Sequence, residues 1–184
     1  MVINKIVSFV LKNATPIITL LGLALSYYKL KKTFKNDIDK LRYQKVYEKI
    51  EDLPFEIIMI LQKAYECSND NVKWKKLTNE LNTFNSKVIA YGSPKAVELC
   101  AYIQQLAYNN ENEPYKTLAG YALLVSQLKY DLSNQIISPE LYFKNKIKDY
   151  QVTKNKVNGY VNIIVDELRL NKEFKINGSI SLEK

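Results

Sequence analysis

The stretch "ATPIITLLGLALSYYKLKK", Ala14 to Lys32, holds the longest uncharged apolar run of this 184-residue chain. The sixteen residues from Asn13 to Tyr28 carry no charge, and as a helix they span about 24 Å. That length is slightly less than a hydrocarbon core of ~30 Å, and flanking lysines can extend it by snorkelling. The run therefore predicts a single-pass transmembrane helix over residues 13–30, preceded by a short amphipathic segment, residues 1–12.

The residues that flank this run are of the types found at membrane surfaces. Aromatic side chains suit the interfacial belt, and lysines suit anionic headgroups. More lysines follow the run than precede it, so the positive-inside rule places the C-terminal domain in the cytoplasm. The predicted membrane-flanking residues are Lys12, Tyr27, Tyr28, Lys29, Lys31, Lys32 and Lys35.

Two other interpretations of the run stay open. Lys5 and Lys12 followed by a short apolar run and Ala24-Leu25-Ser26 resemble an export signal with a cleavage site, although the downstream lysines oppose translocation. Alternatively, residues 13–30 form a core helix, since a helix that is hydrophobic all round belongs at the centre of a soluble bundle.

The formal net charge of +8 is concentrated near the N-terminus. Residues 1–50 hold ten Lys/Arg and three acids, giving +7, whereas residues 51–184 hold seventeen and sixteen, giving +1. Only Arg42 and Arg169 are arginines, and specific recognition of bases and phosphates relies on arginine. We therefore expect lipid, not nucleic acid, at the lysines; a membrane-tethered nucleic-acid-binding protein is the alternative function.

Residue types that carry much of enzyme chemistry are absent or scattered. The chain has no histidine, and its two cysteines, Cys67 and Cys100, lie far apart, so we expect reduced structural thiols, no metal site and no cofactor. Carboxylates that could act as acid and base share no obvious face, and solvated helix surfaces explain them. These carboxylates are Asp131, Glu140, Asp149, Asp166 and Glu167. The sequence predicts that the protein is not an enzyme.

Apolar residues recur at three- and four-residue steps through most of residues 31–170, which predicts an all-α fold with a cytoplasmic bundle of five or six helices. Pro54 should split the first long helix near Leu53. Loops are expected at Cys67–Asn71 and Asn109–Pro114, a last helix over about 158–170, and a polar tail over 171–184.

The sequence "AYGSPK" marks a turn between two helices. We expect Gly92 to end one helix in a left-handed conformation, Ser93 to cap the next and Pro94 to begin it, with Tyr91 packed between helices. The functional alternative is an anion site built from the helix N-terminus and Lys95.

Three motifs, "LRYQKVYEKIEDL", "KVIAYGSPKAVELC" and "LLVSQLKYDLS", follow the basic flank. Together with the span they resemble a loosely defined group of small bacterial membrane-anchored helical proteins with a Tyr-Gly-Ser turn. The resemblance covers roughly residues 14–150 and implies the fold, the topology and a bacterial cell membrane, but no catalytic residue. Where that group continues the turn with acidic residues, this chain has Pro94 and Lys95.

These observations predict a membrane-anchored protein that acts through protein contacts, as an adaptor, a regulator or a phage-defence protein. Its partners would be anionic lipid, an unidentified protein and, through the span, further copies of itself.

Overall fold

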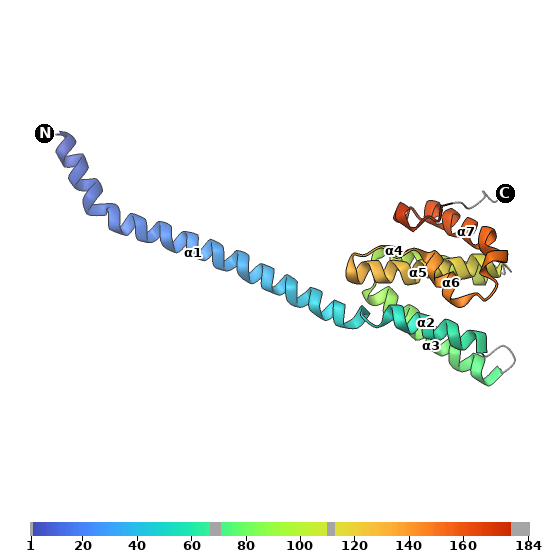
Figure 1. Cartoon of the computed structure of the whole chain (residues 1–184). Coiled ribbons are helices and arrows are strands. Elements are labelled where there is room, and N and C mark those ends of the chain that lie inside the picture. Colours follow the sequence, from blue (N-terminus) through green and yellow to red (C-terminus); the bar gives the residue numbers. More distant parts are fainter. Residues whose placement is uncertain (1, 67–70, 110–112, 178–184) are drawn as a thin grey trace. The chain divides into compact units, whose positions relative to one another are not determined.

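The chain folds into helices joined by short connections (Figure 1). The computed structural model describes residues 2–66, 71–109 and 113–177, with side chains from Leu23 onward except those of Ala24, Tyr65, Glu66 and Asn71. Within these residues all regular structure is helical, so the all-α prediction is confirmed. The helices are α1 (Val2–Ile50), α2 (Leu53–Glu66), α3 (Asn71–Tyr91), α4 (Pro94–Tyr108), α5 (Pro114–Ser133), α6 (Pro139–Lys146), α7 (Tyr150–Glu167) and the 3-10 turn η1 (Lys172–Phe174).

The chain divides into two compact units, Met1–Lys45 and Val46–Lys184. Unit 1 is helical from Val2, and α1 runs on to Ile50, which packs against the core of unit 2. Residues 31–45, which we placed in the bundle, thus belong to the unit of the N-terminal helix. The predicted break near Leu53 is confirmed, because α2 begins there with Pro54 in its first turn, where a missing N–H costs little.

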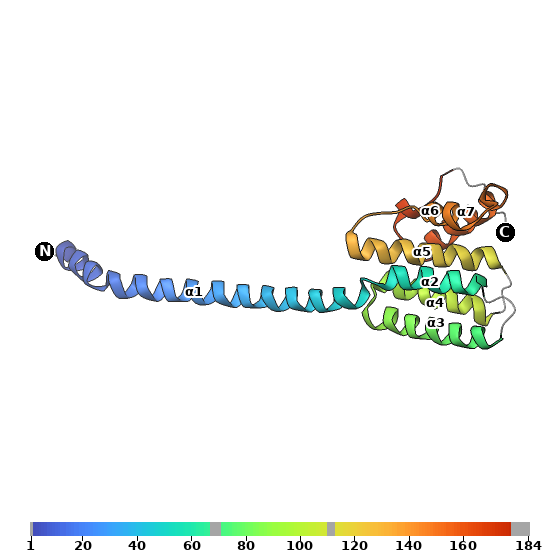
Figure 2. The ribbon, with the colours of Figure 1, turned by 60° about the horizontal axis from the view of Figure 1, so that its bottom comes forward.

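The core of unit 2 is built around α5, which contacts α2, α4, α6 and α7. Figure 2 shows α5 between the pair α6–α7 and the pair α2–α4. Its sequence is apolar or small on most sides, which is the composition of a helix surrounded by others. The buried α5 residues are Ala119, Gly120, Ala122, Leu123, Leu124, Ser126, Gln127 and Leu128.

Gly120 sets how closely α4 approaches α5. A Cβ atom at this position would lie 2.9 Å from Cγ1 of Ile103 on α4, closer than side chains normally pack. Glycine here lets the two helices come together, and Ile103 fills the space that a larger residue would occupy.

The C-terminal part of the bundle differs from the prediction. Helix α7 begins at Tyr150, about eight residues before the expected start near 158, and it ends at Glu167. The predicted polar tail contributes to the core, because Phe174 is fully buried and Ile176 is 5 % exposed. Asn162 fixes this segment, since its side chain accepts a hydrogen bond from the Ile176 N–H (2.9 Å) and donates one to the Ile176 carbonyl (3.1 Å). Residues 178–184 lie outside the described part.

The connections are only partly described. Helix α3 begins at Asn71, the last residue of the first predicted loop, and residues 67–70 lie outside the description. In the second predicted loop α4 ends at Tyr108 and α5 begins at Pro114, with residues 110–112 outside. After α7, Arg169 has a left-handed φ of 49°, and the Leu170 N–H donates to the Val165 carbonyl (2.9 Å), which closes the helix end.

Candidate functional site

The predicted membrane-flanking residues lie along α1. Tyr27, Tyr28, Lys29, Lys31, Lys32 and Lys35 are all exposed on this helix. Lys12 and most of the predicted span, residues 13–30, have side chains outside the description. Among the helices as far as they are described, none is both long enough and apolar enough to cross a membrane.

Large apolar side chains of α1 are exposed as well. Leu23 is 65 % exposed, Leu30 71 % and Phe34 67 %, and none of them belongs to the core cluster of the bundle. The residues of 13–30 whose side chains are described, Leu23 and residues 25–30, are thus exposed residues of unit 1. An exposed apolar helix of this length is unusual for a surface in contact with water alone.

The predicted turn after α3 is formed, with two differences. Ser93 has an extended backbone, and its Oγ accepts a hydrogen bond from the Ala96 N–H (3.2 Å), with Pro94 in the first turn of α4. Gly92 is not in the left-handed region as we predicted; glycine is required because a Cβ atom would lie 2.6 Å from the Val88 carbonyl oxygen. Tyr91, the last residue of α3, is 42 % exposed and is not packed between helices as we predicted.

The Ser93 cap is tied to α5. Its Oγ donates to Asp131 Oδ2 (2.6 Å), and the buried Gln127 donates from Nε2 to Asp131 Oδ1 (2.8 Å). Lys95 Nζ donates to the Leu168 carbonyl (2.8 Å) at the end of α7 and pairs with a neighbouring glutamate on α4. Both oxygens of Asp131 and the Lys95 ammonium thus have partners inside the bundle. The geometry fits a structural clamp between α4, α5 and α7.

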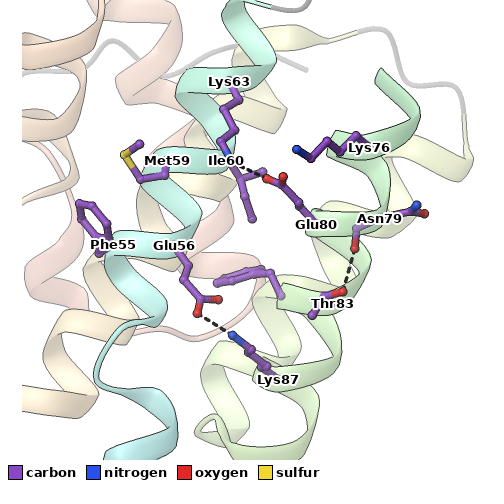
Figure 3. Close-up of a pocket in the computed structure, with 11 residues that line it drawn as sticks. Phe55, Glu56, Met59, Ile60, Lys63, Lys76, Asn79, Glu80, Thr83 and Lys87 are labelled. Atoms are coloured by element: carbon purple, nitrogen blue, oxygen red, sulfur yellow. Dashed lines mark hydrogen bonds and ion pairs between the residues drawn. The ribbon is translucent and has the colours of Figure 1, made fainter. Parts of the chain in front are cut away.

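A first groove lies between α2 and α3 (Figure 3). Its volume is about 420 Å³. Its lining includes the apolar residues Ile60 and Phe84 as well as several charged side chains. Two ion pairs join α2 to α3 at this groove: Lys63 to Glu80 (2.7 Å) and Lys87 to Glu56 (2.5 Å). These four charged side chains pair with one another. Few charged groups in this groove are therefore left to bind a ligand.

A second groove, which we call the α2/α5/α6 groove, has a different electrostatic character. Its volume is about 470 Å³, and its lining contains two lysines, Lys129 and Lys146, but no carboxylate. Within the described part of the chain neither lysine forms an ion pair, and both are exposed. The other lining residues are Pro54, Phe55, Ile58, Val125, Ser126, Ile137, Ser138, Leu141, Tyr142 and Asn145.

Apolar side chains of this groove are accessible. Phe55 is 65 % exposed, Leu141 56 % and Ile137 36 %, although all three belong to a well-packed bundle. Burial raises the pKa of Tyr142 to about 12, so its hydroxyl stays protonated at neutral pH. The groove thus combines an open apolar surface with two free positive charges.

A polar network joins α6 to α7. The Tyr150 hydroxyl lies 3.1 Å from Glu140 Oε1 and 2.9 Å from Asn158 Oδ1, and Asn158 is fully buried. Burial acts to raise the pKa of Glu140, but hydrogen bonds from Lys144 and Tyr150 and the charge of Lys154 lower it below 4.5. Such internal networks specify how helices pack.

The carboxylates considered as an acid–base pair do not come together. Glu140 lies in the network just described and Asp131 at the Ser93 cap. Asp166 pairs with Lys175 (2.7 Å), and Glu167 accepts from Tyr102 (2.9 Å). Asp149 lies exposed just before α7. Within the described residues no cluster of His, Cys, Asp and Glu could hold a metal ion.

One of the two cysteines, Cys100, lies in the part of the chain that the structure describes. Cys100 is a free, buried thiol, and burial raises its pKa to about 12, so it stays protonated and unreactive. Cys67 lies outside the described residues.

Several residues that organise the bundle or line its grooves were missed by sequence reasoning. Gln127 and Asp131 stand four apart on a helix, a spacing that suggests their hydrogen bond. No sequence signal brings Lys129 and Lys146 together, because they come from different helices and meet only when α5 and α6 pack. Likewise, no sequence pattern predicts that the Asn162 side chain donates a hydrogen bond to the Ile176 carbonyl.

Comparison of the chain with protein-family models, with curated proteins and with solved structures found no match. The resemblance to small bacterial membrane-anchored proteins therefore stays a prediction.

Proposed function

We propose that this chain is a membrane-anchored helical protein that acts through contacts with another protein. Residues 13–30 insert into the bacterial cell membrane, the lysines after them bind anionic headgroups, and the bundle lies in the cytoplasm. The observation that carries this proposal is α1: its apolar side chains at Leu23, Leu25 and Leu30 are more than half exposed and are followed at once by lysines. Lipid would bury that apolar surface and attract those charges.

The protein contact belongs to the α2/α5/α6 groove. An occupant of this groove must cover Phe55 and Leu141 and place negative charge beside Lys129 and Lys146. An acidic amphipathic helix from a partner protein meets both requirements, since its apolar face fills the groove and its carboxylates reach the lysines. We assign this groove to such a partner segment.

The membrane half is tested by fractionation of the full chain with a C-terminal tag. We expect the chain to stay in the pellet after an alkaline carbonate wash and the tag to resist protease in intact cells. In a variant with Lys29, Lys31, Lys32 and Lys35 changed to Gln, the chain should stay in the pellet while the tag becomes partly accessible, because the orientation signal is lost. Release of the wild-type chain by carbonate would contradict the anchor.

The groove is tested with synthetic peptides and the full chain in bicelles. Fluorescence anisotropy should show binding of an amphipathic Leu/Glu helix and none of a Leu/Lys helix of the same pattern. Changing both Lys129 and Lys146 to Glu should reduce the affinity at least tenfold. The matched control changes Lys148 and Lys172, exposed lysines outside the groove, to Glu and should leave binding intact.

Two results would count against the assignment. Equal loss of binding in the control variant would show a nonspecific charge effect. Tight, steeply salt-dependent binding of nucleic acid by the full chain would favour the membrane-tethered nucleic-acid-binding protein instead.

A further inference from the structure

Helix α1 carries an apolar stripe on one face, and from Lys31 to Lys45 every large apolar residue except Tyr43 lies on it. Leu23, Tyr27, Leu30, Phe34, Ile38 and Leu41 follow one another at steps of four, three, four, four and three residues. At 100° per residue these six positions fall within about 80° of arc. The stripe ends at the next position of the pattern, which is Lys45.

The stripe is accessible along its whole length. Tyr27 is 69 % exposed, Phe34 67 % and Leu41 58 %, and only Ile38 is partly covered. Within unit 1, residues 2–45 form one continuous helix, so no second element of that unit covers the stripe. A strip this narrow is typical of the seam between two long helices, whereas a helix packed on a broad core shows a wider apolar face.

Lipid cannot cover the far end of the stripe. This step rests on the proposed membrane anchoring: if the hydrocarbon core ends near Leu30, then Leu41 lies eleven residues further on, which is about 16 Å along the helix. The headgroup region of one leaflet is only about 5–8 Å thick. Leu41 would therefore stand in water, and a protein surface is needed to bury it.

The charges beside the stripe indicate what that surface is. Asp37 borders the stripe on one side and Arg42 on the other, five residues apart. In a parallel, in-register pair of helices, a residue on one border of the seam in the first copy faces the residue five positions later on the opposite border in the second copy. Asp37 of each copy then meets Arg42 of the other, giving two symmetric ion pairs. The stripe is thus complementary to itself.

We propose that α1 forms a parallel homodimer through this stripe, with Leu23 to Leu41 as the seam and Asp37 opposite Arg42 of the second copy. The spacing also gives the geometry of the pair. Tyr27 and Ile38 are eleven residues apart, as are Leu30 and Leu41, and an eleven-residue repeat produces nearly straight helices with a slight right-handed supercoil. Two copies anchored in one bilayer present this face at the same depth, which favours the parallel arrangement.

Disulfide cross-linking of the full chain in bicelles tests the seam. Single cysteines are placed in a Cys67→Ser background, with Cys100 kept because it is buried. In a parallel, in-register pair, each seam residue lies next to its own copy. We therefore expect dimer bands for Leu30→Cys, Phe34→Cys and Leu41→Cys, at least fivefold stronger than for the opposite-face controls Lys29→Cys and Asn36→Cys.

Charge exchange gives a second readout that does not depend on the apolar contacts. Asp37→Arg or Arg42→Asp alone, in the Phe34→Cys chain, should reduce the dimer band severalfold, because like charges then face each other. The double variant should restore it to near the starting level. Failure of the double variant to recover would overturn the assigned register.

The outcomes separate this inference from the proposed function. Cross-linking with seam periodicity in a chain that carbonate releases from membranes would keep the seam and overturn the anchor. A carbonate-resistant chain that cross-links only near one position would show an antiparallel pair and overturn the proposal. Equal bands on all faces, or none at seam positions, would overturn it too and leave lipid or another protein as the cover.

Discussion

Helices α1 and α5 are both rich in apolar residues, but they place them in opposite environments. Along α5, Leu123 and Leu124 are fully buried and the helix contacts four others. Along α1, Leu30 is 71 % exposed and Leu41 58 %. The difference teaches that apolar content alone does not identify a core helix. Helix α5 finds its partners within unit 2, whereas the described part of unit 1 is a single helix with no second element to bury its apolar residues.

The largest expected effect is at Leu124 of α5. Leu124→Ala removes a fully buried side chain from the centre of the bundle and should lower the free energy of unfolding by about 2–5 kcal/mol. The matched change on α1, Leu41→Ala, should alter bundle stability by less than about 0.5 kcal/mol. Urea unfolding of the full chain, followed by circular dichroism, measures both. A loss above about 1 kcal/mol for Leu41→Ala would show that α1 is part of the bundle.

A smaller effect is expected from a matched pair of aspartates. Asp131→Ala leaves the buried Gln127 amide and the Ser93 hydroxyl without their shared acceptor, which should cost about 1–3 kcal/mol. Asp39→Ala on α1 removes only an exposed ion pair with Arg42 at 4.0 Å, and the cost should stay below about 0.5 kcal/mol. The same unfolding experiment compares them. Equal costs would mean that the Ser93 clamp contributes nothing beyond an exposed contact.

The smallest expected effect is a pH dependence that arises where α6 and α7 pack beside α5. The pKa of Glu140 is lowered in the folded state, so the stability it contributes is fully present above pH 4.5. This stability is lost as the pH falls through the folded-state pKa, because the unfolded chain binds the proton more readily. Glu140→Gln should therefore flatten the fall in the urea midpoint between pH 5 and pH 3. Glu173→Gln, an exposed control on η1, should follow the wild-type curve.

The sequence predicted where helices begin better than it predicted which residues pack against one another. The Ser-Pro capping signal located the start of α4, because this signal lies within a few residues of the feature it marks. The burial of Phe174 was missed, because its T-shaped contact with Tyr130 (6.3 Å between ring centroids) joins positions far apart in the chain. The residues around Phe174 in the sequence are mostly polar, which led us to predict a polar tail there.

The candidate sites show the same limit. The charge and hydropathy of the sequence were enough to predict that the lysines after Tyr28 lie close together on one helix, since residues three or four apart in sequence are neighbours on a helix. The α2/α5/α6 groove could not, because it exists only where three helices meet. Gly92 shows a third case: its residue type was interpreted correctly as special, but the reason is a close carbonyl oxygen, not a left-handed backbone.

The clamp of Asn162 on Ile176 has a consequence for synthesis on the ribosome. Among the described residues, Phe174 and Ile176 are the last core residues to be translated, so the core of the bundle stays incomplete until they are made. At about 5–20 residues per second, residues 23–41 of α1 are made roughly 7–30 s earlier. Helix α1 is thus complete while the bundle still lacks the residues that close its core.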